Sequence, residues 1–453
     1  MPVSMTSQLA THAPSPIIAE QCDCMVCRDC GALQSLVPVA PGQELVCGRC
    51  GNLLKRPASD WLDKATALAV AAGILFISAN VYTFMTLKLA GIEQDISILS
   101  GVLALAANDR WILSALVLLT IFLLPAFEAF ALLYLLIPHR LQRRLPGQIT
   151  IFRWLVELQP WIMLDVFLLG VLVTTVKLGD NATVEVGPGM LLFFALVFVL
   201  QLGYRVMNKD SLWTWLSPNN RFISDRSEML YDCHACKAIV GLSIVEAQGH
   251  CPRCNAEVHT RTPHSLQRTT ALTLAAAILY IPANLFDIMK YDELGVNYDS
   301  TIFAGVIDLA HHGLWILALV VFVASVVVPV AKLLMLSFLV WSVHTRMNRA
   351  PRQRIKLYRL TELVGRWSMV DVYVVTLLTA AVQFGIIGAV APGPALLPFA
   401  AVVVLTMLAA ETFDPRLIWD PVDQANGAGE ESLGAAASNP AVTQQQPIGS
   451  GTH

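Results

Sequence analysis

The chain has 453 residues, of which 55% are hydrophobic and only 14% are charged. Soluble proteins carry about 25% charged residues, so this composition excludes an ordinary soluble globular protein. The net charge of −3 excludes little, because in a membrane protein the placement of charges matters more than their sum. Charged side chains are absent from the runs 66–87, 111–127, 313–331 and 372–410. A membrane-spanning helix needs about 20 apolar residues, so the chain is expected to cross a membrane several times.

The N-terminal part contains a cluster of cysteines, in the stretch QCDCMVCRDC at 21–30. Cys27 and Cys30 form a Cys-x-x-Cys pair, and a second pair, Cys47 and Cys50, follows after 16 intervening residues. This spacing is typical of a four-cysteine zinc ribbon, in which each pair supplies two ligands of a tetrahedral site. Structural zinc contributes about 10–16 kcal/mol at neutral pH, which is enough to fold a small unit that has almost no apolar core.

The same pattern returns in the second half of the chain. Cys233 and Cys236 are followed by Cys251 and Cys254, with 14 residues between the pairs. Further matches run in order at an offset of 204 to 206: FISAN (76–80) with YIPAN (280–284), 100–113 with 304–317, 153–167 with 359–373, and 186–189 with 391–394. Self-similarity at a fixed offset indicates a structural repeat, so we interpret the chain as two copies of one module.

Each module is expected to contain four membrane-spanning helices after its ribbon. The expected spans lie near 65–88, 109–137, 156–178 and 188–207, and near 269–290, 312–343, 367–390 and 394–411. The loops 139–144 and 344–359 are basic, whereas the loops on the opposite side are acidic or neutral. Basic loops remain in the cytoplasm, which places both ribbons and both termini there. Residues 1–30 lack a basic start followed by an apolar run, so no signal peptide is expected.

These features predict an all-α polytopic membrane protein with two tandem modules of four helices, each preceded by a small cytoplasmic zinc ribbon. The expected domains are a flexible N-terminal arm at 1–23, zinc ribbon 1 at 24–60, transmembrane module 1 at 61–210, a linker and zinc ribbon 2 at 211–262, transmembrane module 2 at 263–420 and a disordered tail at 421–453.

The repeat selects Cys27 and Cys30 as ligands and leaves Cys22 and Cys24 without an assigned role. The eight remaining cysteines predict two zinc ions, one in each ribbon. The alternative is a thiol-redox centre, but a redox Cys-x-x-Cys usually stands alone in a thioredoxin-like context, and the cytoplasm disfavours disulfides. His234 lies next to a ligand but is not needed, because four thiolates complete the coordination shell. The ribbons carry no strong basic stripe, so no nucleic-acid partner is expected.

A second candidate site consists of polar residues inside the expected spans of module 2. An ionisable side chain at membrane depth costs about 2.5–3.5 kcal/mol on insertion scales, which makes each one a functional hypothesis. Lys332 and Asp371 lie at equal depth on neighbouring spans, and Ser325, Ser368 and Thr406 are expected at the same polar network. The alternative is that Lys332 and Asp371 form a structural pair that only sets helix packing.

Module 1 differs at these positions, because Glu128 matches Lys332 and Asp165 matches Asp371. The pair would then be acid–acid, and Lys177 is the nearest candidate to neutralise it. The charge-coupled chemistry is therefore expected in module 2.

The tandem ribbons, YIPAN, WSMVDVY (367–373) and ETFDPRLIWD (411–420) resemble the paraquat-inducible protein A (PqiA/LetA) family over about residues 24–420. The resemblance implies an inner-membrane protein of a double-membraned bacterium, acting with an MCE-domain partner that forms a tunnel across the periplasm. It further implies that the protein loads or unloads phospholipids at the inner-membrane end of this tunnel. Lys332 and Asp371 match polar positions of the family's second module and could serve there as a proton-coupled switch.

Three functions follow from these observations. The first is a lipid transporter or loading factor, which is not an enzyme; no Walker motif occurs, so energy would come from an ion gradient or a partner. The second is a membrane-bound thiol-redox protein. The third is a membrane anchor for the MCE partner that transports nothing.

Overall fold

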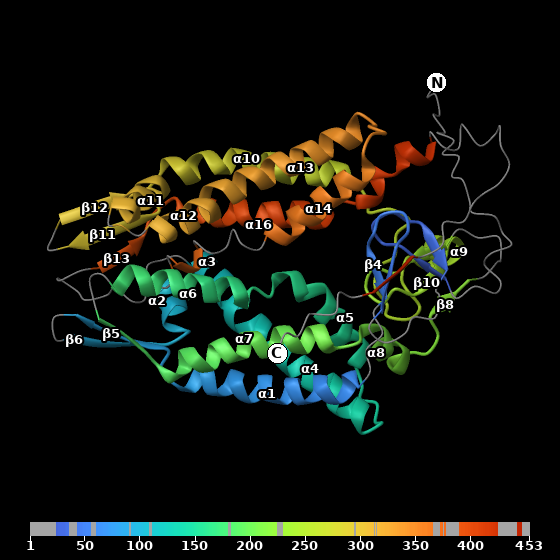
Figure 1. The fold of residues 1–453 in the computed structure, drawn as a ribbon, viewed down its shortest axis with the longest axis horizontal. Coiled ribbons are helices and arrows are strands. Elements are labelled where there is room, and N and C mark those ends of the chain that lie inside the picture. The colour runs from blue at the N-terminus through green and yellow to red at the C-terminus, as the bar shows by residue number, and fades with distance from the viewer. Residues whose placement is uncertain are drawn as a thin grey trace.

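The computed structural model describes residues 24–35, 43–55, 60–89, 92–107, 111–179, 183–223, 230–293, 296–311, 313, 315–365, 372–374, 376, 389–424 and 442–445. These residues form two helical bundles that lie side by side (Figure 1). The cysteine ribbons lie at one end of the bundles, and small β-sheets lie at the other end. The expected repeat is therefore visible in the fold, because each half of the chain builds one bundle.

The first bundle contains the long helices α1 and α7, together with the helical segments that connect them along the chain. The elements are α1 (Trp61–Val81), α2 (Ser100–Ala107), α3 (Trp111–Leu118), η2 (Leu119–Leu123), α4 (Leu124–Arg140), α5 (Gln148–Leu158), η3 (Gln159–Trp161), α6 (Leu164–Gly179), α7 (Pro188–Val206) and α8 (Lys209–Leu216). Its core is aromatic at the sheet end, where Phe84, Phe167 and Phe193 pack with ring centroids 5.3–6.3 Å apart.

The second bundle repeats this order. Its elements are α10 (Ser265–Leu285), α11 (Ile302–His311), α12 (Trp315–Phe322), η4 (Val323–Val327), α13 (Val328–His344), α14 (Pro351–Gly365), α16 (Leu396–Thr412) and η6 (Pro415–Ile418). Residues 372–374 are helical and belong to the expected span 367–390, most of which lies outside the described residues. The bundles meet where the Tyr373 ring packs edge-on against Phe167 of α6, with centroids 5.6 Å apart. Gly170 permits this contact, since a Cβ there would lie 3.1 Å from the Tyr373 Cβ.

The expectation of an all-α fold is wrong at the far end of each bundle, where three antiparallel strands form a sheet. Strands β5 (Met85–Leu89), β6 (Ile92–Ile96) and β7 (Thr183–Val186) are ordered β6-β5-β7, and β11 (Met289–Glu293), β12 (Val296–Ser300) and β13 (Ala389–Pro392) are ordered β12-β11-β13. Helices α1 and α10 therefore end at Val81 and Leu285, before the expected ends at 88 and 290. The sequence of β5, MTLKL, does not reveal this change, because its apolar side chains are equally typical of the end of a membrane span and of a strand.

Two glycines explain why VGPG (186–189) and APGP (391–394) match. Gly187 donates a hydrogen bond to the Phe84 carbonyl at 3.1 Å, and Gly393 donates one to the Ile288 carbonyl at 2.9 Å. A Cβ on Gly187 would lie 2.2 Å from the Thr83 carbonyl oxygen, and a Cβ on Gly393 would lie 2.1 Å from the Asp287 carbonyl oxygen, both two residues before the first strand of the sheet. Only glycine allows so close an approach, so both motifs anchor the last helix of a bundle to its sheet.

A widened π-helical turn interrupts the central helix of each bundle at the same place in the repeat. The turns are η2 and η4, and each is followed by a proline, Pro125 or Pro329, in the first turn of the next helix. Proline lacks an N–H group and frees a carbonyl one turn earlier, and a π-turn accommodates this gap. Such turns occur frequently at functional sites, and here both lie in the middle of the bundle.

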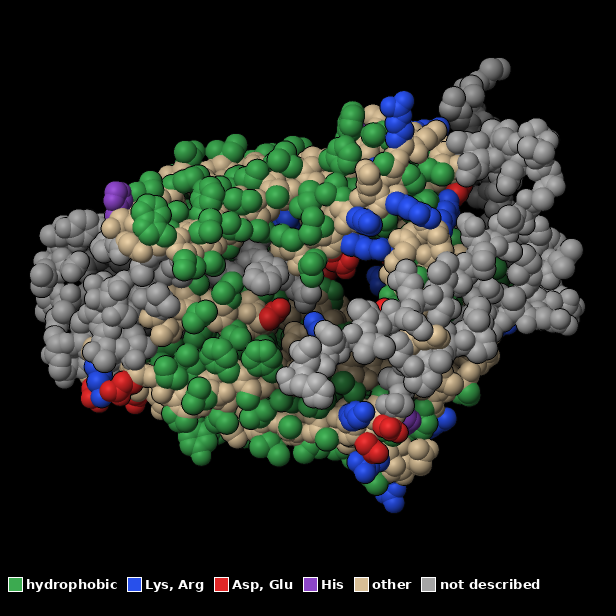
Figure 2. All heavy atoms as spheres, in the orientation of Figure 1, with side chains coloured by type: hydrophobic (Ala, Val, Ile, Leu, Met, Phe, Trp, Pro, Cys, Tyr) green, Lys and Arg blue, Asp and Glu red, His purple; other side chains and the backbone are tan. Residues whose placement is uncertain are grey.

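Five helical stretches of the described chain are long and apolar enough to cross a membrane: Trp61–Val81, Trp111–Arg140, Gln148–Thr175, Pro188–Val206 and Ala318–His344. Helix α16 is apolar but has 17 residues, and α10 begins with the polar sequence SLQRTT. On the face that Figure 2 shows, apolar side chains cover most of both bundles, and the charged side chains that are visible lie mostly toward the ends. The described chain is thus a multi-pass membrane protein.

The ribbons are built from short strands. Ribbon 1 contains β1 (Cys24–Val26), β2 (Leu33–Ser35), β3 (Gln43–Val46) and β4 (Leu53–Lys55), and ribbon 2 contains β8 (Arg221–Phe222), β9 (Leu230–Asp232), β10 (Ile239–Gly241) and α9 (Leu242–Gln248). Strand β14 (Val442–Gln445) pairs antiparallel with β3, although it lies in the segment expected to be a disordered tail. The rest of this segment after residue 424, and the arm at 1–23, lie outside the described residues.

Candidate functional site

Each ribbon brings four buried cysteine sulfurs together. In ribbon 1 the Sγ atoms of Cys27 and Cys50 are 3.5 Å apart, and those of Cys30 and Cys47 are 3.6 Å apart. In ribbon 2 the corresponding pairs, Cys233–Cys254 and Cys236–Cys251, are 3.5 and 3.6 Å apart. All four sulfurs of a cluster lie within 4.8 Å of one another.

These distances fit a metal ion better than a disulfide. Zinc–sulfur bonds of about 2.3 Å place the sulfurs of a tetrahedral site about 3.8 Å apart. A disulfide requires about 2.05 Å, and the eight cysteines are free. Without a cation, the contact with Cys27 raises the pKa of the Cys30 thiol well above its usual range, and Cys233 does the same for Cys236. A cation between the sulfurs would offset the repulsion that four buried thiolates exert on one another.

The backbone of each Cys-x-x-Cys turn repeats one local pattern. The carbonyl of the first cysteine of a pair accepts a hydrogen bond from the backbone N–H group four residues later. In ribbon 1, Gly31 donates in this way to the Cys27 carbonyl at 2.8 Å. Gly31 and Gly51 adopt positive φ angles of 70° and 71° in ribbon 1, and Lys237 and Asn255 do so in ribbon 2. Cys24 is the first residue of β1, and Cys22 lies outside the described residues. His234 is partly exposed and points to Glu157, with its Nε2 atom 3.5 Å from the carboxylate.

The ribbons dock crosswise on the bundles. Ribbon 1 precedes module 1 in the chain, but its cysteines pack with residues of module 2: Leu339, Ile355, Phe413, Ile418 and Trp419. Arg359 of α14 forms an ion pair with Asp29 of ribbon 1 and lies 3.6 Å from the Cys50 Sγ atom. Ribbon 2 packs into the large core cluster, which holds residues of both modules, and its polar contacts reach Arg153 and Glu157 of module 1.

Ribbon 2 is held by the repeat counterpart of Arg359. Arg153 of α5 donates hydrogen bonds to the carbonyls of Asn255 at 2.9 Å and Cys254 at 3.3 Å. Arg253 of ribbon 2 in turn donates to the Ser217 carbonyl at 2.8 Å and lies over the Trp213 ring of α8. The sequence did not single out Arg153 or Arg359 as docking residues. Their matching positions, 206 residues apart in the repeat, are a signal that could have found them.

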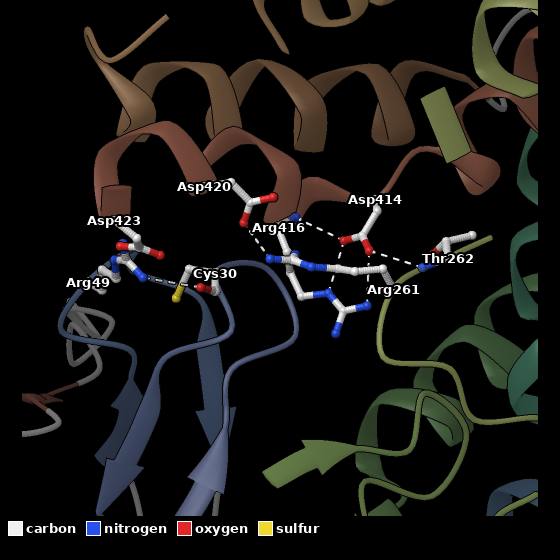
Figure 3. A network of polar contacts seen from close by, with 8 residues as sticks. All are labelled: Cys30, Arg49, Arg261, Thr262, Asp414, Arg416, Asp420 and Asp423. Carbon is white, nitrogen blue, oxygen red and sulfur yellow. Dashed lines mark hydrogen bonds and ion pairs between the residues drawn. The ribbon is translucent and has the colours of Figure 1, made fainter. Parts of the chain in front are cut away.

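The segment ETFDPRLIWD joins the two ribbons to the end of α16 (Figure 3). Asp414 accepts hydrogen bonds from the Arg416 side chain at 3.0 Å and from the backbone N–H of Thr262 at 3.3 Å. Burial alone would raise the pKa of Asp414, but the hydrogen bonds and charge of Arg416 outweigh it, so this pKa lies below its usual value. Arg261 pairs with Asp420 on the same segment.

Ribbon 1 contributes to the same junction. Arg49 lies over the Trp419 ring at 4.5 Å, pairs with Asp423 and donates to the Cys30 carbonyl at 3.3 Å. A polar cavity of about 540 Å³ lies between the ribbons and the ends of α14 and α16, where Arg28, Arg359 and Arg416 face several carboxylates. The junction is thus a charged, hydrogen-bonded seam rather than an apolar interface.

Inside module 2, the structure brings together part of the expected polar network. Lys332 is fully buried, and its Nζ atom donates to the Thr406 hydroxyl of α16 at 2.6 Å and to the Gly365 carbonyl at 3.4 Å. Ser325 lies in the π-turn η4 and donates to the Val321 carbonyl of its own helix at 2.7 Å. Asp371 and Ser368 lie outside the described residues, so the expected Lys332–Asp371 pair remains a prediction.

Module 1 has no lysine at this position. Glu128 is buried in α4 where Lys332 lies in α13. Asp165 of α6 has a buried oxygen atom with no hydrogen-bond partner among the described residues, and it interacts electrostatically with the Tyr373 hydroxyl. Lys177, the residue expected to neutralise this pair, belongs to α6, and its side chain lies outside the described part. The two bundles therefore share a scaffold and differ in their buried charges.

Comparison with known proteins assigns the chain to a family. A family model described as paraquat-inducible protein A matches residues 62–217 and 266–423, one match for each bundle. The chain is 34% identical over 417 residues to the intermembrane transport protein PqiA of Escherichia coli K12, covering 90% of this chain and 96% of the relative. It is 31% identical over 401 residues to the lipophilic envelope-spanning tunnel protein A of the same organism, covering 88% and 92%.

A third relative, a probable intermembrane transport protein of Haemophilus influenzae, is 28% identical over 402 residues, which cover 88% of this chain and 96% of the relative. No solved structure matches the chain. The relatives are named as transport proteins rather than enzymes. Because the family model covers both bundles and the identity extends over nearly the whole length, the chain belongs to the paraquat-inducible protein A family.

Proposed function

We propose that this chain is a bacterial inner-membrane protein that moves phospholipid between the inner membrane and an MCE-domain tunnel in the periplasm. The observation that carries the proposal is a fully buried Lys332, bonded to Thr406, inside a protein whose relatives are named for intermembrane transport and an envelope-spanning tunnel. An idle charge at membrane depth is costly, so its retention favours a role in moving a polar or charged group. Lys332, Asp371, Ser325, Ser368 and Thr406 form the proposed transport network.

The proposal extends to the architecture. Each module has four spans, and the ribbons, the basic loops and both termini lie in the cytoplasm, as the distribution of Lys and Arg favours. The β-sheets then face the periplasm and the tunnel partner. Each ribbon holds one zinc ion through its four cysteines, and the metal ties the ribbon fold together without taking part in transport.

Lys332 follows the π-turn η4 and Pro329 along the same helical stretch. Pro329 has no N–H group to donate to the preceding turn η4, and the described bonds of Lys332 go to Thr406 of α16 and Gly365 of α14. A change in the protonation of Lys332 or Asp371 would weaken these bonds between α13, α14 and α16. Helix movement can in this way be coupled to a proton.

The test is lipid transfer with purified protein in vesicles and its tunnel partner as acceptor. Lys332→Ala and Asp371→Asn are expected to lower transfer at least tenfold at normal expression. Glu128→Gln, at the matching buried position of module 1, is the control and is expected to keep transfer within about twofold of wild type. Full transfer by both module 2 variants would refute the charge-coupled mechanism.

Two other outcomes would favour other functions. Titratable thiols in the ribbons, with less than one zinc ion per chain, would favour a thiol-redox protein. Wild-type protein that binds the tunnel partner but transfers no lipid would identify a membrane anchor.

A further inference from the structure

The bundles differ on one outer face, between the first helix and the central helix of each module. In module 2 a groove of about 860 Å³ lies between α10 and α13. Its walls come from 266–277 of α10 and 337–344 of α13. This volume falls within the range of about 300–1,000 Å³ that is common for small-molecule sites.

In module 1 the same face is closed. Leu133 of α4 fills the space beside Gly73 of α1, where an added Cβ would lie 2.9 Å from the leucine side chain. Arg140 and Asp63 bridge the ends of the two helices, with Nη1 and Oδ1 3.2 Å apart. The closed face shows that the module scaffold does not itself require a groove.

The repeat identifies which substitutions open the groove in module 2. Ser337 stands in place of Leu133, and so removes the side chain that fills the closed face. Gln267 and His344 stand in place of Asp63 and Arg140, and so remove the ion pair. The first change removes side-chain volume from this face, and the other two remove the ion pair that ties the helix ends together.

One buried group in the groove lacks a partner. Thr273 lines the groove and is only 6% exposed, yet its hydroxyl has no hydrogen-bond partner among the described residues. In module 1 the matching residue is Ala69, which needs none. A buried hydroxyl without a partner is destabilising, so its presence beside the groove favours a ligand that supplies one.

The groove has the polarity of a lipid site. Leu266, Ala271, Leu274, Ala277 and Val340 line it with apolar atoms, whereas Gln267, Thr270 and His344 lie toward its ribbon end. The stretch 266–277 rises about 17 Å along α10, which is close to one leaflet of a hydrocarbon core about 30 Å thick. Trp341, an exposed residue of the kind found at membrane interfaces, lies at the polar end.

We infer that the groove between α10 and α13 binds one phospholipid of the leaflet on the ribbon side, with an acyl chain along α10 and the polar headgroup at Gln267 and His344. The ester oxygens of the lipid would accept the hydrogen bond that Thr273 lacks. The inference rests on the proposed function in one respect, because a membrane protein that moves lipid needs a place from which to take it. The site is distinct from Lys332, which faces α14 and α16.

The experiment is photo-crosslinking of the full-length protein in phospholipid vesicles that contain a phosphatidylethanolamine with a diazirine in one acyl chain. Ser337→Trp fills the groove and is expected to lower labelling of 266–277 and 337–344 at least fivefold. Leu334→Trp, on an exposed site of the same helix outside the groove, is the matched control and is expected to keep the label. The double variant Gln267→Asp with His344→Arg, which restores the ion pair of module 1, is expected to lower labelling as well.

Equal labelling of wild type and Ser337→Trp, or labelling spread evenly over the outer helices, would overturn the inference. The inference would also be overturned if the groove took no label in vesicles of lipid alone and were instead occupied by a helix of a partner protein. Lipid transfer is measured separately in the same preparations. A wild type that is labelled in the groove but transfers nothing would refute the proposed function and leave the lipid site standing.

Discussion

Gly187, the residue just before α7, offers a sharp test of how each bundle is anchored to its sheet. Replacement by alanine would place a Cβ atom 2.2 Å from the Thr83 carbonyl oxygen, where about 3.2 Å is the usual lower limit of a carbon–oxygen contact. The start of α7 must then move away from Thr83 and Phe84, the residues just before β5, by about 1 Å. This movement stretches two hydrogen bonds, from Gly187 to Phe84 at 3.1 Å and from Gly189 to Thr83 at 3.0 Å.

The expected cost follows from these two effects. Overpacking in a close-packed region costs about 1–3 kcal/mol, and each weakened backbone hydrogen bond costs about 1 kcal/mol. The free energy of unfolding is therefore expected to fall by about 3–5 kcal/mol for Gly187→Ala. In a module of this size, 1 kcal/mol shifts the unfolding midpoint by about 2–4 °C, so the midpoint should fall by about 10 °C.

The assay is thermal unfolding of purified protein in detergent, followed by tryptophan fluorescence. Gly203→Ala in the same helix is the control, because its Cβ would meet Leu68 at an ordinary 3.6 Å. Alanine is the better helix former by about 1 kcal/mol, so this control is expected to leave the midpoint unchanged or to raise it. If Gly187→Ala unfolded within about 2 °C of wild type, the close approach to the strand would not be the reason for this glycine.

The remaining predictions concern the ribbons and their docking. Cys236→Ser is expected to lower the zinc content from about two ions per chain to one, measured by mass spectrometry of the metal; an unchanged content would exclude zinc in ribbon 2. Arg153→Ala is expected to speed hydrogen exchange in ribbon 2 alone, and Arg359→Ala in ribbon 1 alone; the opposite pattern would contradict crosswise docking. Burial lowers the pKa of Lys209 to about 8, so the folded chain binds this proton less tightly than the unfolded chain. Stability should then rise as the pH increases from about 8 to 10, by up to about 3 kcal/mol, and this rise should be absent in Lys209→Met.

Much of the fold was predictable because its signals are local. The apolar runs of α1, α4, α7 and α13 identified spans by length alone, and the prolines at 125 and 329 mark the π-turns in both copies. The sheets were missed because a strand of five residues gives a weak periodic signal beside a long apolar helix. Within the membrane network, the structure shows Lys332 bonded to Thr406, whereas Asp371 lies outside the described residues and its part in the network stays a prediction.

The groove between α10 and α13 could not be predicted from the sequence, for a different reason. Ser337 and Thr273 are single polar residues in apolar helices, and neither on its own indicates a binding site. Their meaning appears only when α10 and α13 are compared with α1 and α4 in space, where Leu133 and Gly73 close the same face. Packing between helices depends on pairs of residues about 60 positions apart, which no local pattern links.

The sequence by itself determined the two four-cysteine clusters, the two-fold repeat and the membrane character of the chain. These properties depend on residue spacing along the chain, where two cysteines three positions apart can share a metal in any context. The tertiary structure alone decided that ribbon 1 docks on module 2 and ribbon 2 on module 1. The repeat makes both modules nearly equivalent as docking sites, so the choice comes from differing side-chain contacts, with Arg359 meeting the carboxylate of Asp29 and Arg153 the carbonyls of Cys254 and Asn255.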